Sequence, residues 1–423
     1  MKFIRRLTDN ATLKSLGPGL ITGAADDDPS GIATYSQAGA QFGFNTLWTL
    51  VLTYPFMVGI QLVSARIGRV TGRGLAANIR RAYSPWLLYA IVLLLLVANV
   101  INIAADIAAM GEAARLVTGV GSAHLYSLGF GVLCLSLQII LPYTTYVRYL
   151  KWLTMGLLAY VATVFAVKMP WLEVLARTAW PHFTFTRESV ALIVAIFGTT
   201  ISPYLFFWQA SQEVEEIRAD DSARALRSQP SAAKLQLGRI KSDTFIGMGF
   251  SNLVAFFIML TTAATLGAHG ITTIQSSAQA AEALRPVAGE FAFFLFALGI
   301  IGTGLLAVPV LAGSAAYAVT ESFRWKNGLD LKAVEAQEFY GIIALATIGG
   351  MLLNFAPIDP IKALVLSAQI NGVIAVPIMT VMMMLAHNRK IMRRFTLTRR
   401  HTIIGWFGVA VMLVAVVAMF ATM

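Results

Sequence analysis

Cysteine, histidine and charge are scarce in this 423-residue chain. Its single cysteine, Cys134, excludes a disulfide framework and a cluster of thiolate metal ligands. Only 13% of the residues are charged, about half of the share in an average soluble domain, whereas 57% are apolar. A soluble protein of this length needs more polar surface, and a disordered chain has far fewer apolar residues. The composition therefore indicates a membrane protein.

Eleven segments are apolar enough to cross a bilayer as helices, which takes about 20 residues each. We therefore predict an all-α transmembrane protein of one domain, residues 1–423. The predicted spans are residues 15–43, 46–66, 86–114, 124–142, 149–169, 189–214, 243–268, 290–320, 337–356, 359–386 and 403–422. The first span carries three aspartates and lacks a cleavage pattern, so we do not expect a signal peptide.

The net charge of +11 is unevenly distributed along the chain. With a cytoplasmic N-terminus, 26 of the 32 Lys and Arg residues fall in the cytoplasmic segments 1–14, 66–81, 148–151, 218–241, 324–332 and 389–400. Positive residues stay on the cytoplasmic side of membrane proteins, so this split supports the eleven spans and an extracytoplasmic C-terminus. We interpret the basic clusters as signals of topology and contacts with anionic lipids, not as a nucleic-acid site. We expect a multi-pass protein of the cell membrane.

Two of the spans are interrupted by proline beside small or polar residues. Span one reads Gly17-Pro18-Gly19 and then Asp26-Asp27-Asp28-Pro29-Ser30-Gly31, and span six reads Gly198-Thr199-Thr200-Ile201-Ser202-Pro203-Tyr204. Proline breaks a helix, and hydrocarbon tolerates broken backbone only where it is buried or lines a cavity. The breaks divide the chain into repeats at 15–169 and 189–386, followed by a last span. Five spans per repeat invert the second repeat, which is a pattern of transporters with a central binding site.

The residues at the breaks favour a hard cation. An ionised aspartate in mid-membrane costs about 3 kcal/mol, so Asp26, Asp27 and Asp28 either line water or face a cation. An interfacial turn is the alternative for Asp26 and Asp27. The other donors are also oxygens, and they belong to Thr199, Thr200, Ser202 and Gln369. Oxygen donors without sulfur or imidazole suit Mg²⁺, Ca²⁺ or Mn²⁺.

These motifs resemble those of the Nramp family of divalent-metal transporters, which have the LeuT-type fold. The family motif Asp-Pro-Gly-Asn aligns with Asp28-Pro29-Ser30-Gly31, and Gly-Ala-Thr-Ile-Met-Pro-His aligns with residues 198–204. A glutamine eight residues before a proline in span ten matches Gln369 and Pro377. The resemblance implies a metal site formed by Asp28, Gly31, Thr199, Ser202 and Gln369.

Departures from the family motifs indicate which ion is carried. Gly31 replaces the asparagine ligand, and Ser202 replaces the methionine that favours transition metals. This set resembles the Nramp-related magnesium transporters, a branch that carries Mg²⁺ and Mn²⁺ without proton coupling. In that reading the metal is the substrate, no cofactor is needed, and no obligate protein partner is implied.

Groups linked to proton movement are also altered. The family histidines of span six are Tyr204 and Gln209 here, and the Asp-x-x-Glu pattern of span three keeps Asp106 but has Ala109 in place of the glutamate. Loss of histidine removes the side chain that titrates near neutral pH. Asp106 could still relay a proton, so a proton-coupled Mn²⁺ or Fe²⁺ transporter stays open as an alternative.

Two further classes of function are less well supported. A transporter of amino acids or other organic solutes would share the fold, but three aspartates beside the site disfavour a carboxylate substrate. An enzyme is disfavoured because the sequence has no His-Glu-x-x-His, no Gly-x-Ser-x-Gly and no P-loop. A receptor without ion flux is not excluded.

Polar residues outside the breaks have simpler interpretations. Asn99 and Asn102 share one face of span three, and we expect them to bond neighbouring helices or to line a vestibule. Glu213, Glu215 and Glu216 follow span six, where we expect a solvated helix end, with Glu213 facing an inner exit as the alternative.

Overall fold

The computed structural model describes residues 22–23, 25–141, 156–355 and 359–423, and these residues form helices and turns without any strand. Eight helical stretches among them are long and apolar enough to cross a membrane. One of these, Pro29–Thr71, contains the second part of the first predicted span and the whole of the second span, which are separated at Gly43, where φ is 58°. The Gly17-Pro18-Gly19 motif and much of the fifth predicted span lie outside the described residues.

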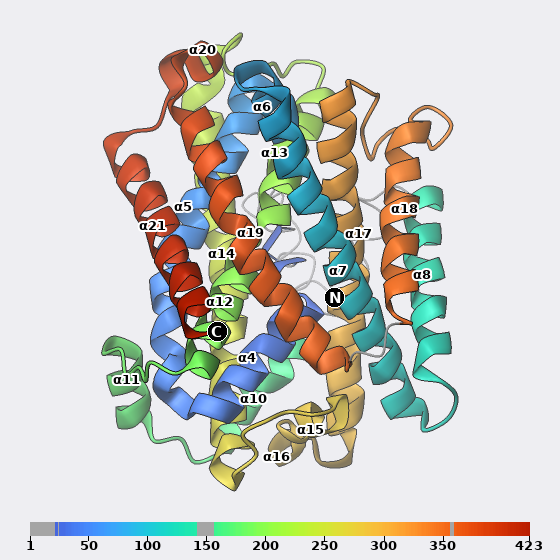
Figure 1. Cartoon of the computed structure of the whole chain (residues 1–423), viewed down its shortest axis with the longest axis vertical. Coiled ribbons are helices and arrows are strands. Elements are labelled where there is room, and N and C mark those ends of the chain that lie inside the picture. The colour runs from blue at the N-terminus through green and yellow to red at the C-terminus, as the bar shows by residue number, and fades with distance from the viewer. Residues whose placement is uncertain (1–21, 24, 142–155, 356–358) are drawn as a thin grey trace, which may run out of the picture.

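The long helices stand side by side in one bundle, and short helices cover its two ends (Figure 1). The described α-helices are α4 (Pro29–Phe42), α5 (Leu47–Thr71), α6 (Leu75–Ala82), α7 (Pro85–Thr118), α8 (Ala123–Ile140), α10 (Leu158–Ala166), α11 (Trp171–Ala179), α12 (Arg187–Thr200), α13 (Pro203–Ala219), α14 (Ala233–Ala264), α15 (Ser277–Glu282), α16 (Arg285–Ala288), α17 (Ala292–Phe323), α18 (Gln337–Leu353), α19 (Pro360–His387), α20 (Arg389–Met392) and α21 (Arg399–Thr422). The described part of each predicted span is helical, apart from residues 27–28 and 201–202 at the two breaks and a few residues at span ends.

Local signals explain where the long helices begin. Ser84 and Asp359 cap α7 and α19, each with a proline at the first helical position. Proline is suited to that position because the amide it lacks would have no partner within the helix. Pro29 and Pro203 are likewise the first residues of α4 and α13, although Ser202 makes no side-chain capping bond, so the prolines of the breaks start helices rather than kink them. Pro55, Pro309 and Pro377 lie inside α5, α17 and α19.

Helices from the two predicted repeats pack around the broken segments. α4 packs along α14 and also contacts α12 and α19, while α12 packs along α19 and α7 along α17. Gly198 lets α12 approach α19, because a Cβ there would clash with the backbone of Ala368 and Gly372. The boundaries that we predict for the repeats, 15–169 and 189–386, stay a prediction.

Glu213 and Glu215 after span six are buried, which corrects the expectation of a solvated helix end for these two residues, whereas Glu216 is partly exposed. Glu213 has no exposed surface, and its Oε2 lies 2.6 Å from Arg239 Nη2. Glu216 Oε2 lies 2.9 Å from the same nitrogen. This ion-pair cluster joins α13 to α14 at the end of the bundle that carries α6 and α20. Sequence polarity could not distinguish a buried pair from a solvated face.

Candidate metal-binding site

The break in span one is a helix start formed around Asp28. Its Oδ1 accepts hydrogen bonds from the Gly31 amide and the Ser30 hydroxyl, both at 2.7 Å. Pro29 follows as the first residue of α4. Asp28 is nevertheless only 1% exposed, in the interior of the bundle. A helix N-terminus offers a carboxylate favourable amide dipoles, which explains how this charge is held away from water.

The break in span six presents backbone carbonyls to the same region. α12 ends at Thr200 and α13 begins at Pro203, which leaves Ile201 and Ser202 between them. The Ser202 hydroxyl donates to the Thr199 carbonyl at 2.7 Å and lies 3.2 Å from the Gly198 carbonyl. Serine therefore stabilises the unwound turn with its own side chain, and it places a hydroxyl oxygen beside the Thr199 carbonyl.

The two breaks meet at Gly31. A Cβ built on Gly31 would lie 3.1 Å from Thr199 Oγ1 and 3.5 Å from Asp28 Oδ1. Thr199 Oγ1 is buried and has no hydrogen-bond partner among the described residues. Asp28, Gly31 and Thr199 are therefore brought together as the sequence predicts, with Ser202 bonded to the Thr199 backbone. Because even a single Cβ at Gly31 would be in tight contact, glycine at this position lets the Asp28 carboxylate and the unpartnered Thr199 hydroxyl lie close together.

Two side chains of α13 connect it to the first break. The Tyr204 hydroxyl lies 3.2 Å from Asp28 Oδ2 and 3.2 Å from the Ala25 carbonyl. The Thr22 hydroxyl donates to Gln209 Oε1 at 2.6 Å. Tyr204 and Gln209 occupy positions that we align with family histidines, and each forms a hydrogen bond that links the two broken spans.

Asp26 and Asp27 are buried as well, which excludes an exposed interfacial turn. They are 1% and 3% exposed, and the hydroxyl of Ser251 lies 2.7 Å from Asp26 Oδ2 and 3.0 Å from Asp27 Oδ1. Ser251 is on α14, so these carboxylates face span seven rather than the metal position at Gly31. Thr200, another secondary candidate, donates its hydroxyl to the Ile196 carbonyl within its own helix.

Asp106 is the fourth buried carboxylate of this region. It has no exposed surface, and neither of its side-chain oxygens has a hydrogen-bond partner in the described part of the chain. One turn before it on α7, Asn102 exchanges amide hydrogen bonds of 2.9 and 3.2 Å with Asn371 of α19. Asn99 donates to the Leu311 carbonyl and to Ser314 of α17. Both asparagines therefore bond neighbouring helices.

The charge of these residues favours a cation. None of Asp26, Asp27, Asp28 and Asp106 forms an ion pair with a described residue. A buried carboxylate without a counter-charge is costly, and the cost falls when a cation enters.

Gln369 is the predicted ligand that the described contacts do not connect to Gly31. Its side chain is partly exposed, whereas Asn371, two residues later and on a different face of α19, is fully buried and bonded to Asn102 of α7. Its role as a ligand stays a prediction. Sequence reasoning missed Asn371, although an amide in an apolar span was a signal, and it missed Ser251, which no signal distinguishes from other helix serines.

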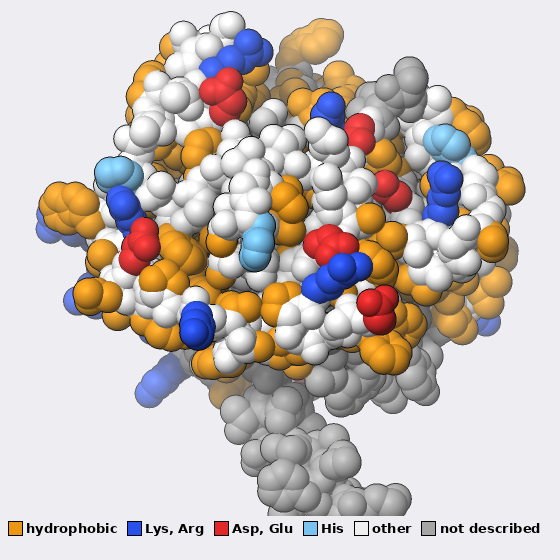
Figure 2. Space-filling view, turned by 90° about the horizontal axis from the view of Figure 1, so that it is seen from below, with side chains coloured by type: hydrophobic (Ala, Val, Ile, Leu, Met, Phe, Trp, Pro, Cys, Tyr) orange, Lys and Arg blue, Asp and Glu red, His pale blue; other side chains and the backbone are white. Residues whose placement is uncertain are grey.

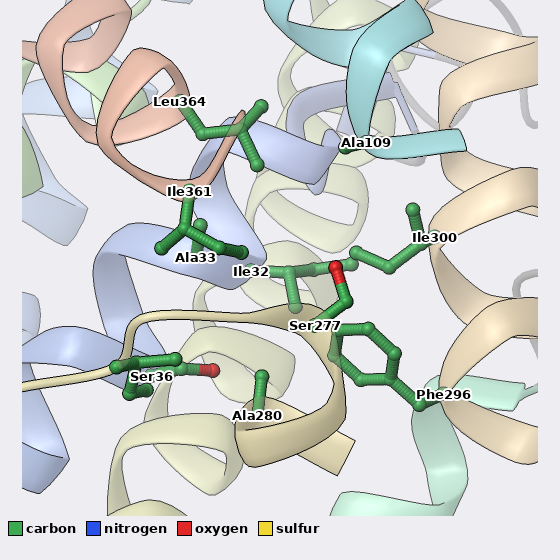
Figure 3. A pocket seen from close by; sticks show the side chains of 11 residues that line it. Ile32, Ala33, Ser36, Ala109, Ser277, Ala280, Phe296, Ile300, Ile361 and Leu364 are labelled. Atoms are coloured by element: carbon green, nitrogen blue, oxygen red, sulfur yellow. The ribbon is translucent and has the colours of Figure 1, made fainter. Parts of the chain in front are cut away.

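Beyond Gly31, an apolar layer covers the site toward the end of the bundle that carries α15 and α16. Figure 3 shows Ile32 of α4, Ile300 and Phe296 of α17 and Ile361 of α19 turned toward a shared pocket. This pocket holds only about 10 Å³, no more than one water molecule needs. A pocket of this size is too small for a hydrated ion.

Comparisons with known proteins agree with this architecture. Residues 19–422 match the family model described as "Natural resistance-associated macrophage protein-like". A divalent metal cation transporter MntH of Yersinia enterocolitica is 28% identical over 326 residues, 73% of each chain. The protein of the same name from Erwinia tasmaniensis is 27% identical over 312 residues, 70% of this chain and 69% of its own.

Solved structures share the fold. The crystal structure of the Eremococcus coleocola manganese transporter, in complex with an aromatic bis-isothiourea substituted compound, has a TM-score of 0.75. It is 16% identical, and the match covers 97% of this chain and 87% of the other. Mhp1, a nucleobase-cation-symport-1 family transporter in a closed conformation, has a TM-score of 0.63 at 13% identity, covering 96% of this chain and 92% of the other.

These likenesses confirm the predicted LeuT-type architecture with its broken first and sixth spans. The family consists of membrane transporters and not of enzymes, as the sequence indicates. With a family model matched from residue 19 to residue 422, this multi-pass membrane protein belongs to the Nramp family.

Proposed function

We propose that this protein imports Mg²⁺, and also Mn²⁺, by alternating access and without proton coupling. The observation that carries the proposal is the set of groups around Gly31: the Asp28 carboxylate, the unpartnered Thr199 hydroxyl and the Ser202 hydroxyl next to the Thr199 carbonyl. All of these donors are oxygens. Relatives at 27–28% identity are named divalent metal cation transporters, which supports a divalent substrate.

The donor atoms around Gly31 support Mg²⁺ as a substrate. Mg²⁺ dehydrates reluctantly and is usually bound through one or two carboxylates with several waters retained. The Asp28 carboxylate with the hydroxyls of Thr199 and Ser202 fits this requirement. A thioether would favour softer metals, but Ser202 stands in that position. The same oxygen set accepts Mn²⁺, which is also found in oxygen sites.

The charge distribution gives the orientation of the protein in the membrane, and the membrane potential then gives the direction of transport. The ends of the helices near α6 and α20 carry the basic segments 66–81, 218–241 and 389–400, so we place this end in the cytoplasm. On the opposite face, which Figure 2 shows, Lys and Arg side chains are few and scattered. A negative interior attracts each charge with about 2.3 kcal/mol per 100 mV, so uncoupled entry of a divalent ion is driven inward.

A proton-coupled carrier of Mn²⁺ or Fe²⁺ is the second candidate. It is favoured by Asp106, a buried carboxylate with two unpartnered oxygens. Against it, Tyr204 and Gln209 occupy the positions of the family histidines, and both already take part in hydrogen bonds between the broken spans.

Proteoliposomes that contain a Mg²⁺ indicator, and in parallel a pH indicator, test both candidates. The proposal expects Mg²⁺ uptake driven by a negative interior, without acidification of the lumen. Asp28→Ala should abolish uptake, whereas Asp220→Asn, an exposed change outside the site, should not alter it. Acidification in step with Mn²⁺ uptake would favour the proton-coupled candidate, and Mg²⁺ uptake unaffected by Asp28→Ala would disprove the site.

A further inference from the structure

A second cavity, unrelated to the ion site, lies between α5, α14 and α21 near the end of the bundle that carries α6 and α20. Its volume is about 250 Å³. Its apolar walls come from three separate parts of the chain, namely Leu62 and Val63 of α5, Leu237 and Ile240 of α14, and Leu397 before α21. The cavity therefore joins spans two, seven and eleven on the outside of the bundle, where lipid surrounds a membrane protein.

Three basic side chains line this cavity, one from each helix. They are Arg66 of α5, Lys241 of α14 and His401 of α21. None of the nine lining residues is acidic, and neither Arg66 nor Lys241 forms an ion pair with any described residue. The charges of Arg66 and Lys241 repel each other, so this pair is stabilised by an anion. Basic pockets between transmembrane helices on the cytoplasmic side bind anionic lipid head groups.

Each basic group retains a hydrogen-bond donor for a ligand. Arg66 donates through Nε to the Phe395 carbonyl at 3.0 Å and through Nη2 to the Thr396 carbonyl at 3.2 Å. These bonds fix the guanidinium plane at the cavity, and no described residue accepts from Nη1. The His401 ring contacts Thr398 through Nδ1, which leaves Nε2 for another partner. Lys241 is exposed, with Nζ 5.9 Å from the centre of the Phe245 ring.

We propose that this cavity binds an anionic phospholipid. The phosphate lies among Arg66, Lys241 and His401, and an acyl chain covers the apolar walls. The basic groups and the apolar walls of the cavity together fit one ligand that is anionic at one end and apolar along its length. A soluble phosphate would leave the apolar walls uncovered. No residue of the cavity belongs to the ion site, so the proposal is independent of the transported ion.

Native mass spectrometry of the full-length protein, delipidated and titrated with phosphatidylglycerol or phosphatidylcholine, tests the proposal. We expect tighter binding of phosphatidylglycerol. A basic group near the membrane surface contributes about fivefold in affinity for an anionic lipid. Lys241→Gln should therefore weaken the binding of phosphatidylglycerol about fivefold and leave the binding of phosphatidylcholine unchanged. The double variant Lys241→Gln and His401→Gln should weaken the binding of phosphatidylglycerol further. Lys332→Gln, an exposed change between α17 and α18, is the matched control and should bind as the wild type does.

A second variant tests the apolar part of the cavity. Leu237→Trp fills the cavity but keeps all three basic groups, so it should also reduce phosphatidylglycerol binding. Inorganic phosphate at the same concentration should not displace the lipid. The proposal is overturned if the two lipids bind equally well to the wild type, if Lys241→Gln and Leu237→Trp both bind as the wild type does, or if inorganic phosphate displaces the lipid completely.

Discussion

The Tyr204 hydroxyl lies 3.2 Å from Asp28 Oδ2 and equally far from the Ala25 carbonyl, so one phenol connects α13 to both sides of the break in span one. Asp28 Oδ1 is already bonded to Ser30 and Gly31. Both carboxylate oxygens of the candidate ligand Asp28 therefore have protein partners. An arriving cation competes with the phenol for Oδ2.

Tyr204→Phe removes this competitor. A hydrogen bond contributes about 1 kcal/mol net, which corresponds to about a fivefold gain in ion affinity. Calorimetric titration of the wild type and of Tyr204→Phe with Mg²⁺ and Mn²⁺ measures this change in affinity. Tyr54→Phe is the control, because its hydroxyl bonds the Phe245 carbonyl away from the site. Weaker binding by Tyr204→Phe would mean that the phenol supports the bound ion instead of competing with it.

Ser202→Met should change the preference among metals. The thioether adds a soft donor next to Thr199, so we expect Mg²⁺ uptake to fall and the affinity for Mn²⁺ or Cd²⁺ relative to Mg²⁺ to rise on the order of tenfold. Competition of each metal against Mn²⁺ uptake in proteoliposomes measures the ratio. Ser202→Ala, which removes the hydroxyl without adding sulfur, separates loss of a ligand from gain of a soft one. An unchanged ratio in Ser202→Met would place residue 202 outside the coordination sphere.

Asp106→Asn removes a buried negative charge at nearly constant shape. We expect the free energy of unfolding to increase by about 1 kcal/mol, because the carboxylate has no described hydrogen-bond partner. Divalent-ion affinity should fall a few-fold because one negative charge is lost from the region. Thermal unfolding and calorimetry give the two values. If Asp106 instead relays protons, the wild type will acidify vesicles during Mn²⁺ uptake and Asp106→Asn will not.

Arg239→Ala should destabilise the protein through the glutamates that it leaves unpaired. Removing one partner of a buried ion pair costs about 3–5 kcal/mol, and Arg239 pairs with Glu213, which has no exposed surface. Thermal unfolding in detergent measures the loss. Arg224→Ala, an exposed change in the preceding loop, should have little effect. Adding Glu213→Gln to Arg239→Ala should restore part of the stability, and failure to do so would assign the loss to another contact of Arg239.

The spans and the breaks were predictable because each has a local cause. A bilayer requires about 20 apolar residues per helix, and proline beside polar residues interrupts such a run wherever it occurs. Asp28, Gly31, Thr199 and Ser202 could be named because they lie at these interruptions. Gln369 lies away from the interruptions and was named as an oxygen donor of span ten and by resemblance, and the described contacts leave it apart from Gly31.

Contacts across the bundle were not predictable from local patterns. Ser251 reaches Asp26 and Asp27 from 224 or more positions away, and Asn371 pairs with Asn102 across 269 positions. Glu213 looks like a solvated acid in the sequence and is a buried partner of Arg239 in the structure. Which polar groups satisfy one another depends on how helices are placed, and helical periodicity alone does not contain that information.

The sequence by itself determined a membrane protein with broken first and sixth spans and oxygen donors at both breaks, because hydropathy and proline act within a few residues. Only the tertiary structure decided that Asp28 and Thr199 meet at Gly31, that Tyr204 bonds the second carboxylate oxygen of Asp28, and that Arg66, Lys241 and His401 share one cavity. The physical reason is that these relationships arise from packing between helices far apart in the chain, and close packing fixes positions that no single segment specifies.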